Sequence, residues 1–118
     1  MAEYSVEYFE NENGEKPAKE FIDSLSPKGR AKIARLLTMI EEFGVSIREP
    51  YPKKLQDEIF ELREKTSEGQ LRVLYFFVIG KRIILTHGFI KKTNRTPLAE
   101  IERAKAYRAV YFKKESGK

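Results

Sequence analysis

The chain contains no cysteine and a single histidine, His87, among its 118 residues. Disulfides and thiolate metal sites are therefore excluded, and one imidazole argues strongly against structural zinc. No apolar run approaches the ~18 residues of a membrane span, and no basic stretch followed by a hydrophobic one marks a signal peptide. We therefore expect one cytoplasmic domain, residues 1–118, with no membrane contact, bound metal or cofactor.

Acidic residues are scarce in the last third of the chain. Residues 81–118 hold 11 Lys and Arg but 3 Asp and Glu, whereas residues 1–80 hold 12 and 15, and the net charge is +5. This asymmetry indicates a surface for nucleic acid or another polyanion. The alternative is a solvated basic tail, which accounts only for Lys113, Lys114 and Lys118.

Hydrophobic periodicity predicts an α+β fold, with a small antiparallel sheet, an N-terminal helical hairpin packed on one face and a C-terminal helix. Ser26 is the expected N-cap of the second helix, and Gly44 is its expected C-cap. Residues 45–56 include two prolines and are expected to form an irregular connection. Strands are predicted at 4–9, 59–64, 71–79 and 82–90, and helices at 17–25, 27–43 and from Pro97 onward.

Gly80 and Lys81 form a good two-residue turn between the last two strands. This turn predicts that Ile79 pairs with Arg82, that Leu74 faces His87 and that Arg72 faces Phe89. Side chains alternate between faces along a strand, so one face is expected to carry Arg72, Leu74, Phe76, Val78, Ile83, Leu85, His87, Phe89 and Lys91. The other face is expected to carry Val73, Tyr75, Phe77, Ile84, Thr86, Gly88 and Ile90.

Cations gather where the last strand ends and the final helix begins, at Lys91, Lys92 and Arg95. Neighbouring cations lower the pKa of a lysine, so that it can transfer protons near neutral pH. Arginine stays charged and stabilises phosphate oxygens, and the N–H groups of the following helix offer a second anion site. The alternative is a solvated basic loop.

Four other residues have two interpretations each. Arg63 either pairs with a neighbouring Glu in solvent or belongs to a site. Arg72 enters an apolar strand and needs a partner, which is either a carboxylate such as Glu61 or a substrate phosphate. His87 is either a packed core residue or a general acid or base. Tyr75 is either a core aromatic or a base-stacking surface.

These side chains suit RNA cleavage by attack of the 2′-hydroxyl on the adjacent phosphorus. Lys and Arg provide charge stabilisation, and Lys91, Lys92 and His87 are the candidate proton carriers. The sequence shows no cluster of Asp and Glu with two-metal character, so a metal-independent reaction is expected.

Spaced motifs carry a resemblance that covers most of the chain and is densest over residues 54–108. The chain resembles the phage-derived, host-growth-inhibiting branch of the RelE/HigB toxins of bacterial toxin–antitoxin systems. The motifs are Lys54-Leu55, Glu61-Leu62-Arg63, residues 72–77, residues 87–92, Thr96-Pro97, and Glu100-Ile101 with Ala104.

The resemblance implies a small antiparallel sheet with helices on one face. It also implies a ribosome-dependent endoribonuclease that cuts mRNA, inhibits translation and growth, and is neutralised by a cognate antitoxin. Operator DNA is a further partner through the antitoxin complex.

Matching by position gives Arg63, Arg72, and Lys91 or Lys92 as catalytic residues, with His87 as a further candidate. Lys54, Tyr75 and Arg95 are the expected RNA contacts. Several relatives place a catalytic tyrosine or histidine after the last strand, but neither Tyr107 nor Tyr111 matches it, so the general base stays open.

Two other functions fit the same sequence. The ParE branch shares the fold class but poisons DNA gyrase and cleaves no RNA, so the fold alone does not decide. A non-enzymatic nucleic-acid-binding module would use the basic tail. Cations on the sheet itself favour RNA cleavage.

Overall fold

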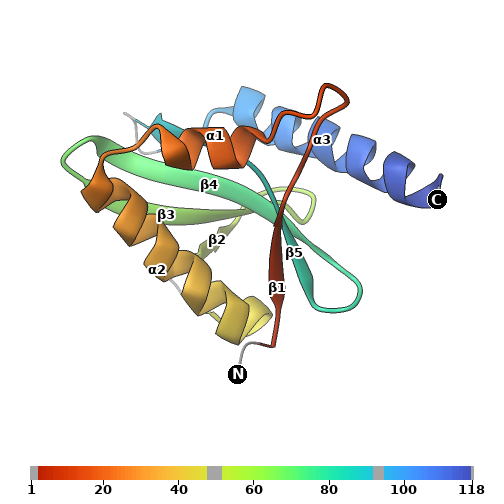
Figure 1. Ribbon diagram of the computed structural model, residues 1–118, viewed down its shortest axis with the longest axis horizontal. Coiled ribbons are helices and arrows are strands. Elements are labelled where there is room, and N and C mark those ends of the chain that lie inside the picture. Colours follow the sequence, from red (N-terminus) through yellow and green to blue (C-terminus); the bar gives the residue numbers. More distant parts are fainter. Residues whose placement is uncertain (1–2, 48–51, 92–94, 118) are drawn as a thin grey trace.

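The computed structural model describes residues 3–47, 52–91 and 95–117 (Figure 1). Its elements in chain order are β1 (Ser5–Tyr8), α1 (Pro17–Asp23), α2 (Pro27–Phe43), the short 3₁₀ helix η1 (Gly44–Ser46), β2 (Pro52–Lys54), β3 (Phe60–Thr66), β4 (Gly69–Val78), β5 (Arg82–Lys91) and α3 (Leu98–Ser116).

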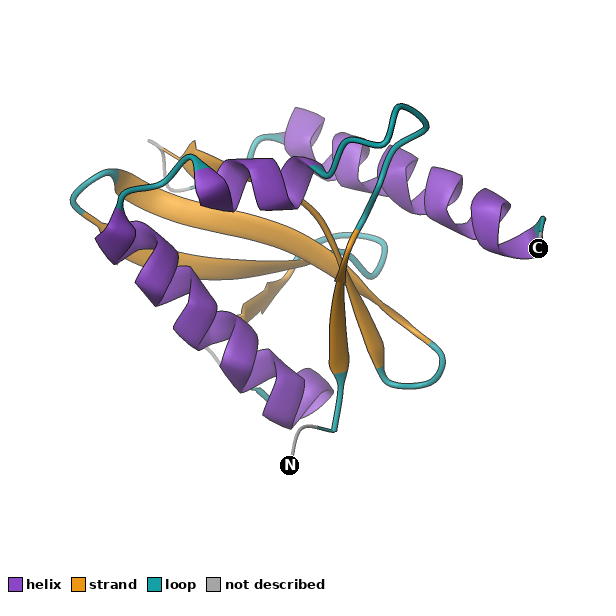
Figure 2. Cartoon of the chain, in the orientation of Figure 1, coloured by secondary structure: helices purple, strands orange, loops and turns teal. Residues whose placement is uncertain are grey.

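The strands form one five-stranded sheet in the order β1-β5-β4-β3-β2 (Figure 2). Strands β2 to β5 pair antiparallel with their neighbours along the chain. β1 lies parallel to β5, with Val6 opposite Ile83, and this makes the sheet mixed. The predicted α+β class is confirmed.

Both N-terminal helices begin where the sequence predicts, and α2 also ends there, whereas α1 ends at Asp23 instead of residue 25. Pro17 and Pro27 each occupy the first helical position, where the missing N–H costs nothing. The Ser26 side chain accepts a hydrogen bond from the Gly29 N–H at 3.2 Å. Gly44 ends α2 with a φ of 50°, and a Cβ there would lie 2.1 Å from the Tyr4 ring. Only glycine fits both requirements.

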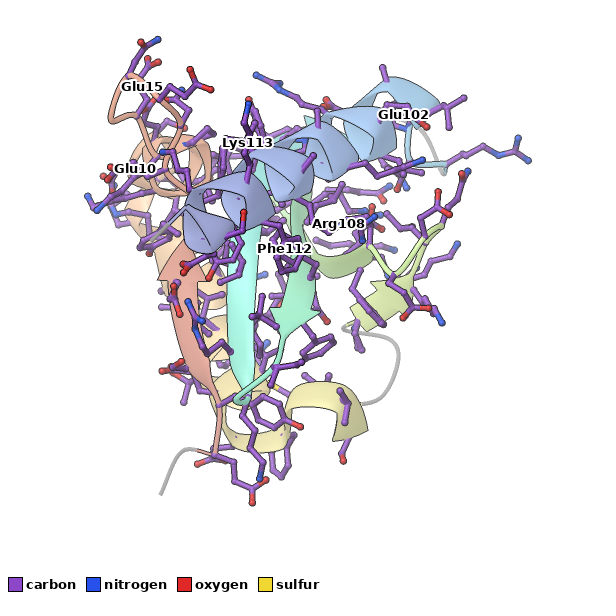
Figure 3. All side chains as sticks on the ribbon, turned by 90° about the vertical axis from the view of Figure 1, so that its right-hand side faces the viewer. Glu10, Glu15, Glu102, Arg108, Phe112 and Lys113 are labelled. Carbon is purple, nitrogen blue, oxygen red and sulfur yellow. The ribbon has the colours of Figure 1, made fainter. Side chains whose placement is uncertain are left out.

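Helices cover both faces of the sheet, and each face has its own core. The hairpin of α1 and α2 covers one face, and the main buried residues there are Ala18, Ile33, Leu36, Ile40, Leu62, Val73, Tyr75 and Leu85. α3 lies across the opposite face (Figure 3), where Ile59, Leu74, Phe76, Ile84, Ala104 and Tyr111 pack together. The expectation of helices on one face is therefore wrong for α3. Along α3, Ile101 and Ala104 are buried but Leu98 is exposed.

The β4–β5 hairpin differs from prediction near its turn. Val78, not Ile79, pairs with Arg82, because the loop has three residues instead of two. A bulge then follows, since Tyr75 pairs with Leu85 but Leu74 pairs with His87, which leaves Thr86 as the extra residue. The longer loop and the bulge shift the register by one residue each in opposite directions, so the predicted pairs Leu74–His87 and Arg72–Phe89 are confirmed.

The three-residue loop changes which face the residues between the turn and the bulge occupy. Ile83 and Leu85 pack on the α2 side, and Ile84 packs on the α3 side, opposite to the prediction. Beyond the bulge, His87 and Phe89 lie on the α3 side as predicted, because they pair with Leu74 and Arg72.

The described parts of the connection at residues 45–56 contain secondary structure that was not predicted. Within it, η1 and the edge strand β2 form, and β2 pairs with β3 through Pro52–Leu62 and Lys54–Phe60. Pro52 is the first residue of an edge strand, a position where proline is tolerated. Within the described residues, no helix is both long enough and apolar enough to cross a membrane.

Candidate functional site

Strand pairing brings three cations, distant in sequence, onto the α3 side of the sheet. Arg63 of β3 lies directly opposite Arg72 of β4, and Arg72 lies opposite Phe89 of β5. Directly paired residues share a face, and so does Lys91, two residues beyond Phe89. Arg63, Arg72 and Lys91 form what we call the basic cluster, which the sequence predicted from three separate segments.

A buried carboxylate anchors the basic cluster. Glu61 is 1% exposed, and its Oε1 lies 3.2 Å from Nε of Arg72. The other carboxylate oxygen of Glu61 accepts a hydrogen bond from the Thr96 hydroxyl, which ties the segment before α3 to the sheet. Of the two partners expected for Arg72, the structure therefore shows the carboxylate.

The rest of the Arg72 guanidinium is also held in place. Nη2 donates to the Gln70 side chain at 2.6 Å, and Nη1 donates to the Leu71 carbonyl at 3.1 Å. Burial and the nearby Arg63 lower the pKa of Arg72, and Glu61 opposes them. An arginine remains protonated under such a shift, so Arg72 is a fixed positive charge beneath this face.

Lys91 is the group of the basic cluster whose proton is easiest to move. Its side chain is 5% exposed. Burial lowers the pKa of Lys91, the cations Arg72, Lys53 and Arg63 lower it further, and Glu61 partly offsets them. The neutral amine is therefore more populated at a given pH than in an exposed lysine, and proton transfer requires this neutral form.

His87 lies on the same face, but inside the core. Its Nε2 is 3.1 Å from Glu100 Oε1, and its Nδ1 is 3.1 Å from the Thr86 hydroxyl. The imidazole ring forms a stacked contact with Phe89 and an edge-to-face contact with Tyr107. Burial lowers the pKa of His87 against the effect of Glu100, so the ring is neutral at pH 7. Its placement matches the packed alternative.

A basic groove of about 590 Å³ lies beside the basic cluster, between β2 and the start of α3. Lys53, Lys54 and Arg95 line it together with Thr96, the residue that binds Glu61. Lys54 forms an exposed ion pair with Glu58 at 2.8 Å. The groove thus brings together two of the three predicted RNA contacts, Lys54 and Arg95, and three cations can hold a phosphate backbone there.

The structure places the third predicted RNA contact, Tyr75, away from this site, and the two tyrosines of α3 have other contacts. Tyr75 packs on the α2 side of the sheet, opposite the basic cluster. Tyr111 accepts a hydrogen bond from Arg82, and Tyr107 stacks on Phe9. The predicted catalytic residue Lys92 lies outside the described residues.

Sequence reasoning missed Lys53, Gln70 and the hydrogen bond from Thr96. Lys53 neighbours the predicted Lys54, but residues 45–56 were expected to be irregular, which hid the strand that directs it. Gln70 stands two residues before Arg72, on the same face of β4, and this spacing was the available signal.

The fold and site define a small basic α+β domain whose cations gather at one end of its sheet. The family model described as Phage derived protein Gp49-like (DUF891) matches residues 20–109. The chain belongs to this phage-derived family, which is associated with toxin–antitoxin systems and implies an antitoxin as partner. A search of curated proteins found no match.

Proposed function

We propose that this chain is the toxin of a type II toxin–antitoxin system, of RelE/HigB type, and that it cleaves mRNA on the ribosome and so stops translation and growth. The observation that carries the proposal is the basic cluster, in which a lysine of lowered pKa lies beside two arginines. Family membership supports the toxin role, and the side-chain chemistry supports the reaction.

The reaction forms a bond between the 2′-oxygen and phosphorus and breaks the bond from phosphorus to the 5′-oxygen. Lys91 in its neutral form takes the proton of the 2′-hydroxyl, and solvent water supplies the proton that the 5′-oxygen gains. Arg63 and Arg72 stabilise the charge that develops on the phosphoryl oxygens. No step in this scheme requires a metal ion.

The remaining groups position the substrate or the site. Lys53, Lys54 and Arg95 bind phosphates on either side of the scissile bond along the basic groove. Glu61 holds Arg72 and Thr96 in place. His87 acts as a packing residue between β5 and α3, because it is 2% exposed and bonded to Glu100.

Induced expression followed by primer extension on translated mRNA tests the proposal. We expect growth arrest with cuts at defined codon positions. Lys91→Arg keeps the charge but removes the proton carrier, so cleavage falls roughly 100-fold or more. Lys19→Gln is the control, because Lys19 is an exposed residue that pairs with Asp23 on α1, and α1 covers the face of the sheet opposite the basic cluster.

The other outcomes point to other functions. Full-length transcripts during arrest, together with inhibited supercoiling by gyrase, would indicate a ParE-like toxin. Absence of arrest, with salt-sensitive binding to duplex DNA, would indicate a nucleic-acid-binding module.

A further inference from the structure

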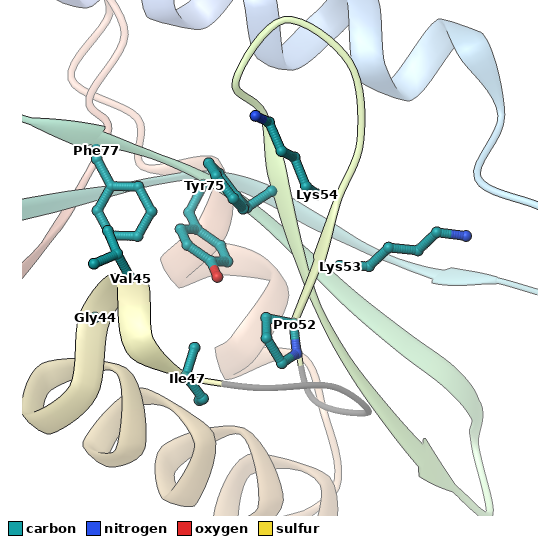
Figure 4. A pocket seen from close by; sticks show the side chains of 9 residues that line it. Gly44, Val45, Ile47, Pro52, Lys53, Lys54, Tyr75 and Phe77 are labelled. Carbon is teal, nitrogen blue, oxygen red and sulfur yellow. The ribbon is translucent and has the colours of Figure 1, made fainter.

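An apolar pocket of about 360 Å³ lies on the α2 side of the sheet, where η1 approaches β2 (Figure 4). Its apolar walls come from η1, β2, β3 and β4. The residues are Val45, Ile47, Pro52, Phe60, Tyr75 and Phe77. The pocket is on the opposite face from the basic cluster, so the proposed reaction does not use it.

The Tyr75 hydroxyl points into this pocket (Figure 4). The residue is 1% exposed, and its hydroxyl makes no hydrogen bond to any residue that the structure describes. Burial raises the pKa of the phenol, so it stays protonated and available as a donor. Because the hydroxyl faces the open pocket, a group that enters the pocket can accept a hydrogen bond from it.

The lining selects between two kinds of occupant. A nucleobase carries several polar edge atoms, and these walls offer it one hydroxyl among aliphatic and phenyl groups, so most of those atoms would lose their hydrogen bonds. An aliphatic or aromatic side chain loses no hydrogen bonds when it packs against such walls, and a backbone carbonyl beside it can accept a hydrogen bond from the Tyr75 hydroxyl. The pocket therefore fits a protein segment better than RNA.

The residues at the rim of the pocket indicate that the bound segment is acidic. Lys53 and Lys54 border the pocket, and both also line the basic groove on the other side of β2. Acidic residues that flank the inserted side chain would pair with these lysines. Val45 at the mouth is 68% exposed, so it is available to a partner.

We propose that this pocket anchors the antitoxin through an apolar side chain of an acidic segment, and that the bound segment covers Lys53 and Lys54. Because both lysines line the basic groove, the partner removes two of its phosphate-binding cations without reaching Lys91. The neutralising effect rests on the proposed function, whereas the anchoring does not.

Calorimetry with the purified cognate antitoxin, sought as the product of a small open reading frame next to the gene, tests the anchoring. Val45→Asp places a charge inside the contact and should weaken binding about 100-fold or more. Tyr75→Phe removes only the donor and should weaken it about 10-fold. Ile79→Asp is the control, since Ile79 is 97% exposed on the β4–β5 loop, and should leave affinity within about 2-fold.

Equal affinities for all three variants, or no binding to the wild-type chain, would overturn the proposal. The proposal would also be overturned if Val45→Asp weakened the binding of a single-stranded RNA oligonucleotide and left antitoxin binding unchanged, because the pocket would then bind RNA. Loss of partner binding in the pocket variants of a chain that cleaves no mRNA would refute the proposed function and leave the anchoring intact.

Discussion

Replacing Arg72 by methionine tests whether its ion pair with Glu61 holds the sheet together or serves only the substrate. Both side chains are almost wholly buried and their charged atoms are 3.2 Å apart. At an effective dielectric constant of about 20, two charges at this distance attract by about 5 kcal/mol. Arg72→Met leaves the Glu61 carboxylate buried without its partner, and such a loss costs about 3–5 kcal/mol.

We expect the lower end of that range, about 3 kcal/mol, because Thr96 still donates to Glu61 and the charge of Lys91 still favours the carboxylate. Stability of a domain this size is about 5–15 kcal/mol, so the variant should still fold. The double variant Glu61→Gln with Arg72→Met removes both charges and should recover about 2 kcal/mol. Urea denaturation of the wild type, both single variants and the double variant measures this coupling.

The same variants separate stability from cleavage. The double variant regains stability but lacks the charge of Arg72, so it should still fail to cut mRNA. Arg35→Met is the matched control, because Arg35 pairs with Glu64 at 3.1 Å but its own side chain is 55% exposed, and the change should cost less than about 1 kcal/mol. A loss below about 1 kcal/mol for Arg72→Met, with additive single effects, would refute the anchoring role of Glu61.

Two further predictions concern β5. Burial lowers the pKa of His87, so the unfolded chain binds a proton at this residue more readily, and stability should fall as pH drops below about 6.5. Urea denaturation from pH 7.5 to 5 should show that the free energy of unfolding depends less steeply on pH in His87→Gln than in the wild type. The same pH dependence in both proteins would contradict this assignment. Gly88→Ala places a Cβ 2.2 Å from the Phe21 ring and should lower stability by about 1–3 kcal/mol, whereas Gly14→Ala, with no atom within 4 Å, should lower it by only about 1 kcal/mol in the same assay.

The sequence was sufficient for the helices because their signals are local. Ser26 and Gly44 mark the ends of α2 by capping geometry, which needs no tertiary contact. The edge strand β2 carries no such signal. Pro52 lowers its strand propensity, and the strand exists because Phe60 and Leu62 offer it a partner.

The candidate site was predictable in composition but not in its buried contacts. Arg72 and Lys91 stand out as cations in the apolar strands β4 and β5, and Arg63 follows Leu62 in the alternating strand β3, so their strands and faces could be inferred. The hydrogen bond from Thr96 to Glu61 joins residues 35 positions apart, and local patterns do not report such a contact. The groove formed by Lys53 and Arg95 likewise depends on where β2 lies relative to α3.

The bulge at Thr86 is what assembles the basic cluster. If the register at Val78–Arg82 continued unbroken, Arg72 would pair with Gly88, and Lys91 would face α2 together with His87. The extra residue reverses the faces beyond it, which puts Lys91 beside Arg72 and sets Gly88 against Phe21 of α1, where no larger residue fits. The Thr86 hydroxyl donates to the Leu74 carbonyl at 3.2 Å, within the irregular part of the ladder. An unbroken run of apolar residues at 83–85 has no alternation that could reveal the bulge in the sequence, so the feature on which the site depends is visible only in the fold.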